Sequence, residues 1–412
     1  AAAQPTPTTP TTPATTTTTS PTPTPTAPTA APTTTPPTPA APTKAAPAPF
    51  DPAAFPGTPA GADDAQPAAV AVRGYLATWL TPWNQDAPNA AKDLLRIRFA
   101  IVRVDARPAR DLAIIGRLAL TAPGSPLLDL YADWRPRAWA GISVGQLRLP
   151  LGAAATTLAP QLVMLDRPGF VNAMTKATFR DVGVLVHSGR AGLADGLVHL
   201  RLAYAGGGGR AGVGPTVAPD APADGLVVAR VQVEPRRGGP RDRQSLGLTY
   251  AREHAAAIAT GDLARDKELA ASVLGRTLVP FGRARTTQLA GVDATVARGP
   301  LWAQAEAMYL HSRPDDGGPR RAARGASLEL AATLPGRPGG LGAVQLAGRG
   351  EVFDPNVDVG GDALVVGSLG ANLLPAPSWR VSIFTSLTRF ERGAPPAAAT
   401  AAEVTARLAA AF

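Results

Sequence analysis

Arginines recur at alternate positions inside apolar segments of this sequence. In LLRIRFAIVRVD at 94–105, Arg96 and Arg98 interrupt a run of aliphatic residues. Strand side chains point to opposite faces in turn, so this segment would have one apolar face and one guanidinium-bearing face. A guanidinium offers five N–H donors in a planar fork and binds phosphate, sulfate or carboxylate. The pattern predicts a wall that meets lipid on one side and a water-filled, anion-attracting channel on the other.

The same alternation nominates further cations for the channel side. Arg167 and Lys176 fall in a predicted loop and Arg180 lies at its exit, where they would form a constriction. The candidate pore-lining and anion-binding residues are Arg96, Arg98, Arg117, Arg167, Lys176, Arg180, Arg201 and Arg230. Carboxylates predicted on this face are expected to pair with part of this set and create a transverse field: Asp129, Asp133, Glu306, Glu329 and Glu351. For any single arginine, the alternative is a salt bridge that only rigidifies the wall.

Strands must position these side chains, and sixteen candidate segments are present. Each alternates apolar and polar residues and is followed by turn residues. They are 70–80, 94–105, 112–120, 128–135, 138–147, 178–187, 198–204, 227–233, 244–251, 286–297, 300–311, 325–334, 341–353, 361–373, 378–390 and 403–412. An even number of strands with about 9–11 residues across the bilayer is typical of bacterial outer-membrane barrels. The prediction is an all-β, sixteen-stranded antiparallel transmembrane barrel over 68–412.

A soluble sandwich or double barrel is the alternative, because it also alternates apolar and polar positions. The core of such a protein requires large, closely packed side chains, whereas aromatic residues make up only 5% of this chain. Many of the predicted outward positions are alanine, which lipid tolerates. The low aromatic content equally weakens the aromatic girdles that a membrane barrel usually carries.

The segment VTARLAAAF favours the barrel. It places Val404, Ala406, Leu408, Ala410 and Phe412 on one face, and a final aromatic residue on an alternating last strand is an outer-membrane assembly signal. The alternative is a small amphipathic helix, since these residues also permit helix.

Residues 1–67 form a region of different composition. The first fifty residues contain 15 of the 44 prolines and 19 threonines, with Lys44 as their only charge. Such a segment cannot bury enough apolar surface to offset its ordering entropy. We expect a disordered, partly polyproline tail in the periplasm, long enough to reach peptidoglycan, although a tail without a partner is the simpler expectation.

Composition narrows the function classes. The chain has no cysteine, which excludes disulfides and thiolate chemistry, and no run of about eighteen uncharged apolar residues, which excludes an ordinary helical membrane span. It begins without a charged and apolar leader, as expected after signal removal. The net charge of +9 comes mainly from arginine and is dispersed over many segments, unlike a nucleic-acid patch. A GC-rich genome is the simpler expectation for the arginine total, and a preference for anion-coordinating guanidinium groups is the alternative.

No catalytic or metal-binding constellation is apparent. The four histidines, at 187, 199, 254 and 311, lack the spacing of metal ligands, and no Ser-His-Asp set is suggested. We therefore expect no enzymatic activity, no catalytic residues and no cofactor.

Residues 93–190 resemble the phosphate-selective porin O and P family of outer-membrane channels. The matching elements, in order, are RIRFAIVRVDARP, LDLYADWRP, GISVGQLRLPLG, MLDRPGF and FRDVGVLVHSG. Weaker matches follow in WAQAEAMYL at 302–310 and VVGSLGANLL at 365–374. In the family, a strand ending in GQ-x-x-x-P leads into a loop that folds into the lumen, which corresponds here to about 151–177.

The resemblance implies a homotrimeric Gram-negative outer-membrane porin that transports small anions by passive diffusion, with phosphate as the family's selected ion. Two features depart from the family: the Thr/Pro tail, and a chain with lysine only at 44, 92, 176 and 267 where the family has a lysine-rich filter. The alternative function is a structural barrel with a plugged pore and a tail that reaches the cell wall.

Overall fold

The structure is a computed structural model of the 412-residue chain. It describes residues 69–85, 95–121, 127–175, 180–189, 191–206, 225–237, 242–255, 284–336, 342–376, 378–391 and 400–412. The predicted tail over 1–67 lies outside the described residues. Within the part described, no helix has the length and apolar character needed to cross a membrane.

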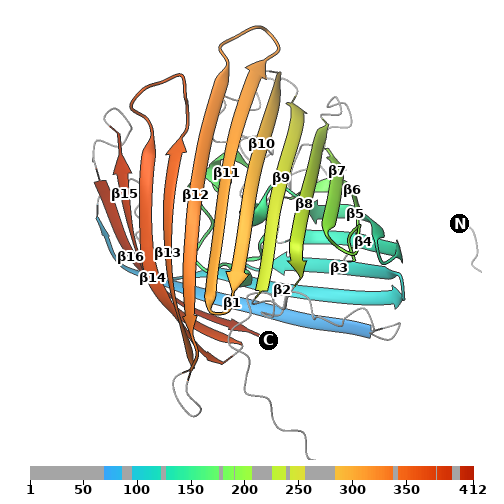
Figure 1. The fold of residues 1–412 in the computed structure, drawn as a ribbon, viewed down its shortest axis with the longest axis horizontal. Coiled ribbons are helices and arrows are strands. Elements are labelled where there is room, and N and C mark those ends of the chain that lie inside the picture. The colour runs from blue at the N-terminus through green and yellow to red at the C-terminus, as the bar shows by residue number, and fades with distance from the viewer. Residues whose placement is uncertain are drawn as a thin grey trace, which may run out of the picture. The chain divides into compact units, whose positions relative to one another are not determined.

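Sixteen β-strands account for nearly all of the described secondary structure (Figure 1). They are β1 (Ala69–Gln85), β2 (Leu95–Ala109), β3 (Leu112–Ala119), β4 (Leu127–Arg137), β5 (Ala140–Arg148), β6 (Arg180–His187), β7 (Val198–Ala205), β8 (Leu226–Arg237), β9 (Asp242–Ala255), β10 (Arg285–Arg298), β11 (Leu301–Pro314), β12 (Arg321–Leu334), β13 (Ala343–Asp354), β14 (Leu364–Ala376), β15 (Trp379–Phe390) and β16 (Thr400–Ala411). Each coincides with one of the sixteen segments predicted from alternation.

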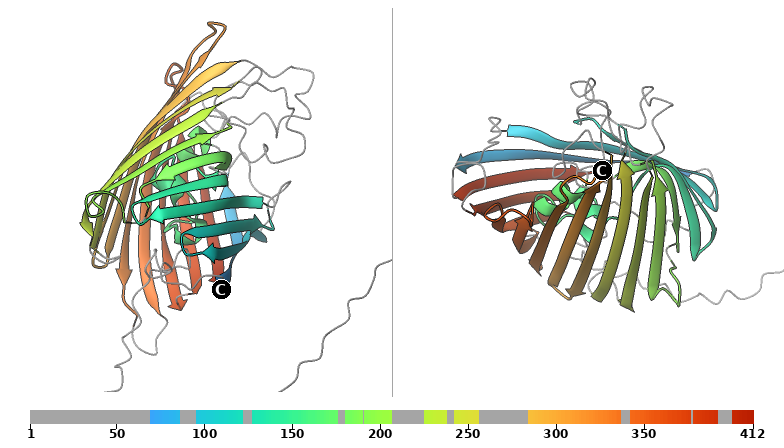
Figure 2. Two further views of the ribbon diagram at one scale, coloured as in Figure 1. Left: turned by 90° about the vertical axis from the view of Figure 1, so that its right-hand side faces the viewer. Right: turned by 90° about the horizontal axis from the view of Figure 1, so that it is seen from above.

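The strands form one closed antiparallel barrel. Each strand pairs with its sequence neighbours, and β1 pairs with both β2 and β16, so the sheet has no free edge. Figure 2 shows the strands running round into a continuous wall with helical turns on its inner side. This confirms the predicted fold class and the strand number.

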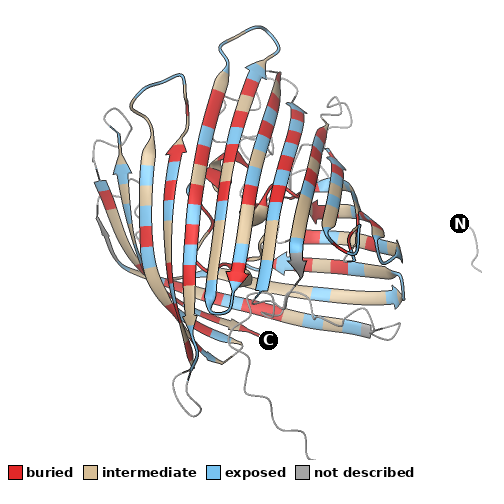
Figure 3. Cartoon of the chain, in the orientation of Figure 1, coloured by how far each residue is buried: buried red, intermediate tan, exposed pale blue. Residues whose placement is uncertain are grey.

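Exposure alternates along the strands, as the banding in Figure 3 shows. On β9, Leu246, Leu248 and Tyr250 are exposed, whereas Thr249 and Ala251 between and beside them are buried. Exposed aliphatic side chains recur in this way on most strands and produce a broad apolar outer surface. A surface of this kind marks contact with lipid or another apolar partner.

The apolar face predicted for 94–105 would carry Leu95, Ile97, Phe99 and Ile101, and the structure agrees with only half of it. The β1–β2 register skips a residue between Ala77↔Phe99 and Thr78↔Ile97, which makes Arg98 the extra residue of a bulge. Leu95 and Ile97 face outward as predicted, but Phe99 and Ile101 pack inside against a cluster that contains Ala77. A bulge shifts the alternation by one position, so the strand changes its apolar face at Arg98.

The C-terminal segment is a strand and not the alternative helix. At the β1–β16 seam, the Gly74 N–H donates to the Phe412 carbonyl oxygen at 2.7 Å, and the Phe412 N–H donates to the Gly74 oxygen at 3.1 Å. A Cβ atom on Gly74 would lie 2.0 Å from Cζ of Phe412, so glycine leaves space for the ring.

Candidate functional site: the inner wall and the inward segment

The chain between β5 and β6 folds into the barrel. We call residues 149–175 the inward segment; it contains α1 (Ala153–Thr156), the 3-10 turn η2 (Ala159–Gln161) and α2 (Gly169–Met174). Its contacts reach strands far from β5, including β11 and β15. A segment that touches distant walls of a closed barrel must lie inside it. This agrees with the inward loop predicted at about 151–177.

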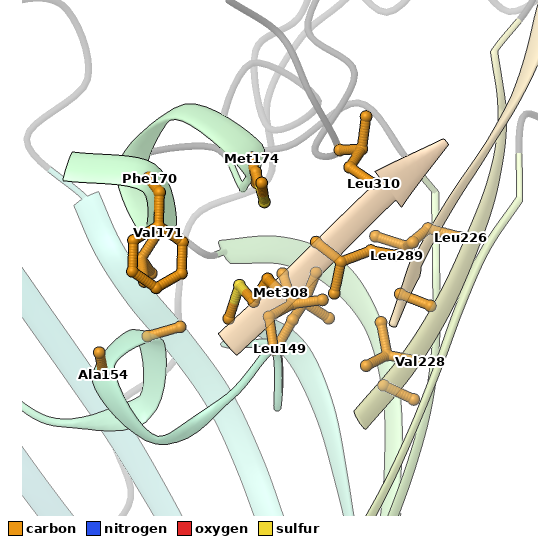
Figure 4. Close-up of a cluster of buried hydrophobic side chains, with 14 of the residues drawn as sticks. Leu149, Ala154, Phe170, Val171, Met174, Leu226, Val228, Leu289, Met308 and Leu310 are labelled. Carbon is orange, nitrogen blue, oxygen red and sulfur yellow. The ribbon is translucent and has the colours of Figure 1, made fainter. Parts of the chain in front are cut away.

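Apolar packing fixes α2 to one side of the inner wall. Phe170, Val171 and Met174 are fully buried in a cluster with Leu289 on β10 and Leu310 on β11 (Figure 4). The Phe170 ring occupies the space above Gly325 on β12, where a Cβ atom would lie 2.4 Å from Cγ of the ring. Burying such a side chain stabilises the docked segment by about 1.5–3 kcal/mol.

Two wall carboxylates hold the beginnings of the two helices. The Ala154 N–H in α1 donates to Oε2 of Glu306 on β11 at 2.9 Å. The Phe170 N–H in α2 donates to Oε1 of Glu351 on β13 at 2.8 Å. First-turn N–H groups have no partner within a helix, so these carboxylates supply the missing acceptors. Gly152, at φ 122°, makes the close approach: a Cβ there would lie 2.1 Å from Oε1 of Glu306.

Donors on strands across the barrel from β5 hold the carbonyl groups of the inward segment. Four side chains of β13 to β16 donate to consecutive parts of the chain: Arg380 Nη1 to Leu162 O at 2.6 Å, Asn372 Nδ2 to Val163 O at 3.0 Å, Arg407 Nη1 to Met164 O at 3.5 Å, and Arg349 Nη1 to Asp166 O at 2.7 Å. On the near side, Arg148 Nη1 donates to the carbonyls of Ala155, Thr156 and Thr157 at 3.3, 3.1 and 2.9 Å. The inward segment is therefore fastened to several strands.

Arg117 and Arg180 share one carboxylate. Arg117 Nη1 and Arg180 Nε each lie 2.5 Å from an oxygen of Asp129, and all three residues are buried. Both arginines lie on the inner side of the wall. Their donors face a carboxylate of the wall. This is the arrangement given above as the alternative to anion binding, a salt bridge that rigidifies the wall.

Arg230 and Arg201 lie side by side on β8 and β7. Arg230 forms a fork with Asp293, through contacts of 2.5 and 2.9 Å, and donates to the Thr249 hydroxyl at 2.9 Å. Arg201 is half-buried, and no described residue forms an ion pair with it. Of the two, Arg201 retains the charge that a solute would meet.

Arg167 cross-links the inward segment through hydrogen bonds to its backbone. Its Nε donates to Ala154 O at 2.8 Å and its Nη2 to Thr157 O at 2.5 Å. Burial lowers the pKa of Arg167 to about 10, so the side chain remains cationic at neutral pH. Its buried donors are occupied by backbone oxygens. The other predicted constriction cation, Lys176, lies outside the described residues.

Arg96 and Arg98 reach the inner side together. Arg98 Nη2 forms an ion pair with Oδ2 of Asp166 in the inward segment at 2.8 Å, and 41% of its side chain remains exposed. Both guanidinium groups lie over the ring of Trp79 on β1, with their Cζ atoms 5.3 and 5.1 Å from the ring centroid. Among the described candidates, these two and Arg201 are the arginines best placed to meet solutes.

The predicted carboxylates are placed as expected, but their partners differ. Asp129 pairs with arginine, whereas Glu306 and Glu351 hold backbone N–H groups. Arg349 Nη1 lies 3.4 Å from Glu329 Oε1, and its Nε lies 3.8 Å from Glu351 Oε2. Sequence reasoning missed the wall residues that fasten the inward segment: Arg148, Arg349, Asn372, Arg380 and Arg407. Alternation places these side chains on the inner face. It does not distinguish a side chain that holds the inward segment from a cation that lines the pore.

A serine, a histidine and an aspartate meet where the sequence suggested no such set. His187 Nε2 lies 3.0 Å from Asp133 Oδ1, and Ser143 Oγ lies 3.1 Å from the same oxygen. The Gly189 N–H donates to His187 Nδ1 at 3.1 Å. The other ring nitrogen, Nε2, faces Asp133 Oδ1 and lies 3.5 Å from Ser143 Oγ. With Nδ1 occupied by the backbone, the histidine is not arranged as a base for Ser143.

Comparison with known proteins gives a likeness in structure only. No family model matches the chain. No curated protein matches it. Among solved structures, an anion-selective porin from Comamonas acidovorans aligns with a TM-score of 0.56 and 13% identity, covering 84% of this chain and 100% of that one.

Two further solved structures are similar. The trimer form of OmpT, an outer membrane protein of Vibrio cholerae, aligns with a TM-score of 0.54, 13% identity and coverage of 84% and 100%. The outer membrane channel DcaP of Acinetobacter baumannii aligns with a TM-score of 0.50, 12% identity and coverage of 84% and 98%. The chain thus has the fold of outer-membrane porins, while its resemblance to the phosphate-selective family stays a prediction.

Proposed function

We propose that this protein is a channel of the bacterial outer membrane through which small anionic solutes diffuse passively. The observation that carries the proposal is a closed barrel with an apolar outer surface and guanidinium groups on its inner wall. The outer surface fits a bilayer, since a closed barrel satisfies the backbone hydrogen bonds of every strand. Solved structures of the same fold are described as porins and outer membrane channels, which supports the assignment.

Anion preference is the finer part of the proposal. Arg96, Arg98 and Arg201 are not fully neutralised by described carboxylates. Fixed cationic donors replace part of the hydration shell that an anion loses in a narrow passage. The Comamonas protein is described as anion-selective, which is consistent with this charge arrangement. Phosphate selection is a further proposal, for which the inner arginines supply suitable forks.

Reversal potentials in planar bilayers test the channel directly. We expect discrete conductance steps in a potassium chloride gradient and a reversal potential whose sign shows chloride to be more permeant than potassium. Replacing both Arg96 and Arg98 by glutamine should move the chloride-to-potassium permeability ratio toward unity, because two positive charges are removed from the inner side of the wall. A preference for potassium in the unmodified protein would contradict the proposal.

The plugged barrel is the second candidate, and the anchoring of the inward segment favours it. Carboxylates of β11 and β13 and donors of β13 to β16 hold this segment across the interior. The same bilayer measurement separates the two functions. A plugged barrel inserts without conductance steps, whereas the same fastening in an open channel defines a fixed constriction.

The remaining proposals concern assembly and the tail. We propose a homotrimer, in line with the trimer form described for the Vibrio cholerae protein. We also propose that residues 1–67 extend into the periplasm and contact peptidoglycan. Purified cell wall should retain the complete chain and release a variant that lacks residues 1–67. Equal retention of the two proteins would remove the peptidoglycan contact from the proposal.

A further inference from the structure

An aromatic residue between two arginines forms a distinct cluster on the inner wall. Trp79 on β1 is 6% exposed, and Cζ of Arg96 and of Arg98 on β2 lie 5.3 and 5.1 Å from its ring centroid. Arg98 also lies 5.2 Å from the Phe99 centroid, and the Phe99 ring meets Trp79 edge to face at 6.4 Å. Aromatic faces attract guanidinium groups, so the rings orient both forks before any solute arrives.

The bulge at Arg98 creates this arrangement. In a regular strand, Arg96 and Arg98 would both alternate with outward residues and lie two positions apart on one face. Here Arg96 is paired with Trp79, while Arg98 is the unpaired extra residue beside it. A bulge re-aims a side chain in this way. Both guanidinium groups therefore converge on a single ring.

Two buried N–H donors of the cluster lack an acceptor. Trp79 Nε1 and Arg96 Nε are buried, and no described residue accepts a hydrogen bond from either. Indole and guanidinium nitrogens only donate, so these groups cannot satisfy each other. Buried donors are nearly always paired. The partner that completes this cluster is a group with acceptor atoms.

The charge of the cluster specifies that partner further. Arg98 Nη2 donates to Oδ2 of Asp166 in the inward segment at 2.8 Å. Among the described residues, this is the carboxylate that pairs with the cluster. Arg96 adds a second positive charge, so one carboxylate faces two cations. A neutral acceptor would leave this excess in place, whereas an anion removes it.

We propose that Trp79, Arg96 and Arg98 form a binding site for an oxyanion, a carboxylate or a phosphate, at the side of the inward segment. Its oxygens would accept from Trp79 Nε1, from Arg96 Nε and from the exposed part of the Arg98 fork. This inference rests on the proposed channel function and adds a saturable site to it. We expect this site to prefer oxyanions over chloride, because an oxyanion presents several oxygens that can meet donors lying apart, whereas chloride presents a single acceptor centre.

Block of chloride current by added anions tests the site. In wild-type channels, phosphate or acetate should reduce the chloride current in a saturable way. Trp79→Phe keeps the ring but removes its N–H group, and Arg96→Lys keeps the charge but removes Nε and the fork. In each variant, the phosphate or acetate concentration that blocks half of the chloride current should rise about tenfold. The block is expressed as a fraction of the chloride current that the same channel carries without added oxyanion. Trp379→Phe and Arg389→Lys are matched controls, since both residues are exposed on β15.

Binding to the barrel in detergent gives a second readout, in which the wild-type titration by itself tests for saturable binding. Titration with phosphate or acetate should change tryptophan fluorescence saturably, and the change should be absent from Trp79→Phe. Stronger binding of phosphate than acetate, or the reverse, identifies the preferred oxyanion. Equal block in the wild type and both variants, or no fluorescence response, would overturn the site while leaving an anion-conducting channel intact. A channel without conductance or with cation preference would instead refute the proposed function.

Discussion

Replacing Asp129 by alanine is expected to lower the free energy of unfolding of the barrel by about 3–5 kcal/mol. Asp129 is buried and accepts from Arg117 Nη1 and Arg180 Nε at 2.5 Å each. Its removal leaves Arg117 as a buried cation without its ion pair and deprives Arg180 of a charged partner. Reversible urea unfolding in lipid vesicles, followed by tryptophan fluorescence, measures the loss.

Asp242→Ala is the matched control for Asp129→Ala. Asp242 is exposed on β9, so its replacement should change the free energy of unfolding by less than about 0.5 kcal/mol. A double variant, Asp129→Ala with Arg117→Met, should recover part of the stability, because one buried cation is then absent. Equal unfolding free energies for the two single variants would show that Asp129 does not hold the arginine pair.

Replacing Phe170 by alanine is expected to release α2 from the wall and raise the mean single-channel conductance with added flicker. Phe170 is 0% exposed and packs above Gly325 of β12. Truncating a buried phenylalanine costs about 3–5 kcal/mol, which exceeds what the single hydrogen bond from the Phe170 N–H to Glu351 restores. Planar-bilayer recordings give the conductance, and limited proteolysis in detergent reports exposure of residues 149–175.

A second substitution tests the same contact from the wall side. Gly325→Ala introduces a methyl group at 2.4 Å from Cγ of Phe170, so it should displace the ring and reproduce the increase in conductance. Tyr309→Ala is the control, since it removes an exposed aromatic ring from the outer face of β11. Wild-type conductance and protease resistance in both Phe170→Ala and Gly325→Ala would mean that α2 does not limit the passage.

Local sequence determined the wall of this barrel. Strand side chains alternate with period two, so each apolar and polar alternation marks a strand by itself, and all sixteen were predictable. The position of the inward turn was implied by the resemblance of GQLRLP to the GQ-x-x-x-P element of the phosphate-selective porins. The alternation depends only on neighbouring residues, which is why β10, β11 and β12 were predicted within a few residues of their ends.

The use of the inner charges was decided by tertiary structure. Alternation gave the inward side of Arg117 and Arg230, but which carboxylate each one meets depends on strand register: Arg117 lies opposite Asp129 in the β3–β4 pair, and Arg230 on β8 reaches Asp293 on β10. The contact of Arg380 with the Leu162 carbonyl depends on the path of the inward segment. Long-range contacts of this kind leave no local pattern. The bulge at Arg98 is similar, since a register shift belongs to the pairing of β1 with β2 and not to either strand alone. The sequence by itself therefore specified a barrel with cations inside, and three-dimensional pairing decided which cations remain for a solute.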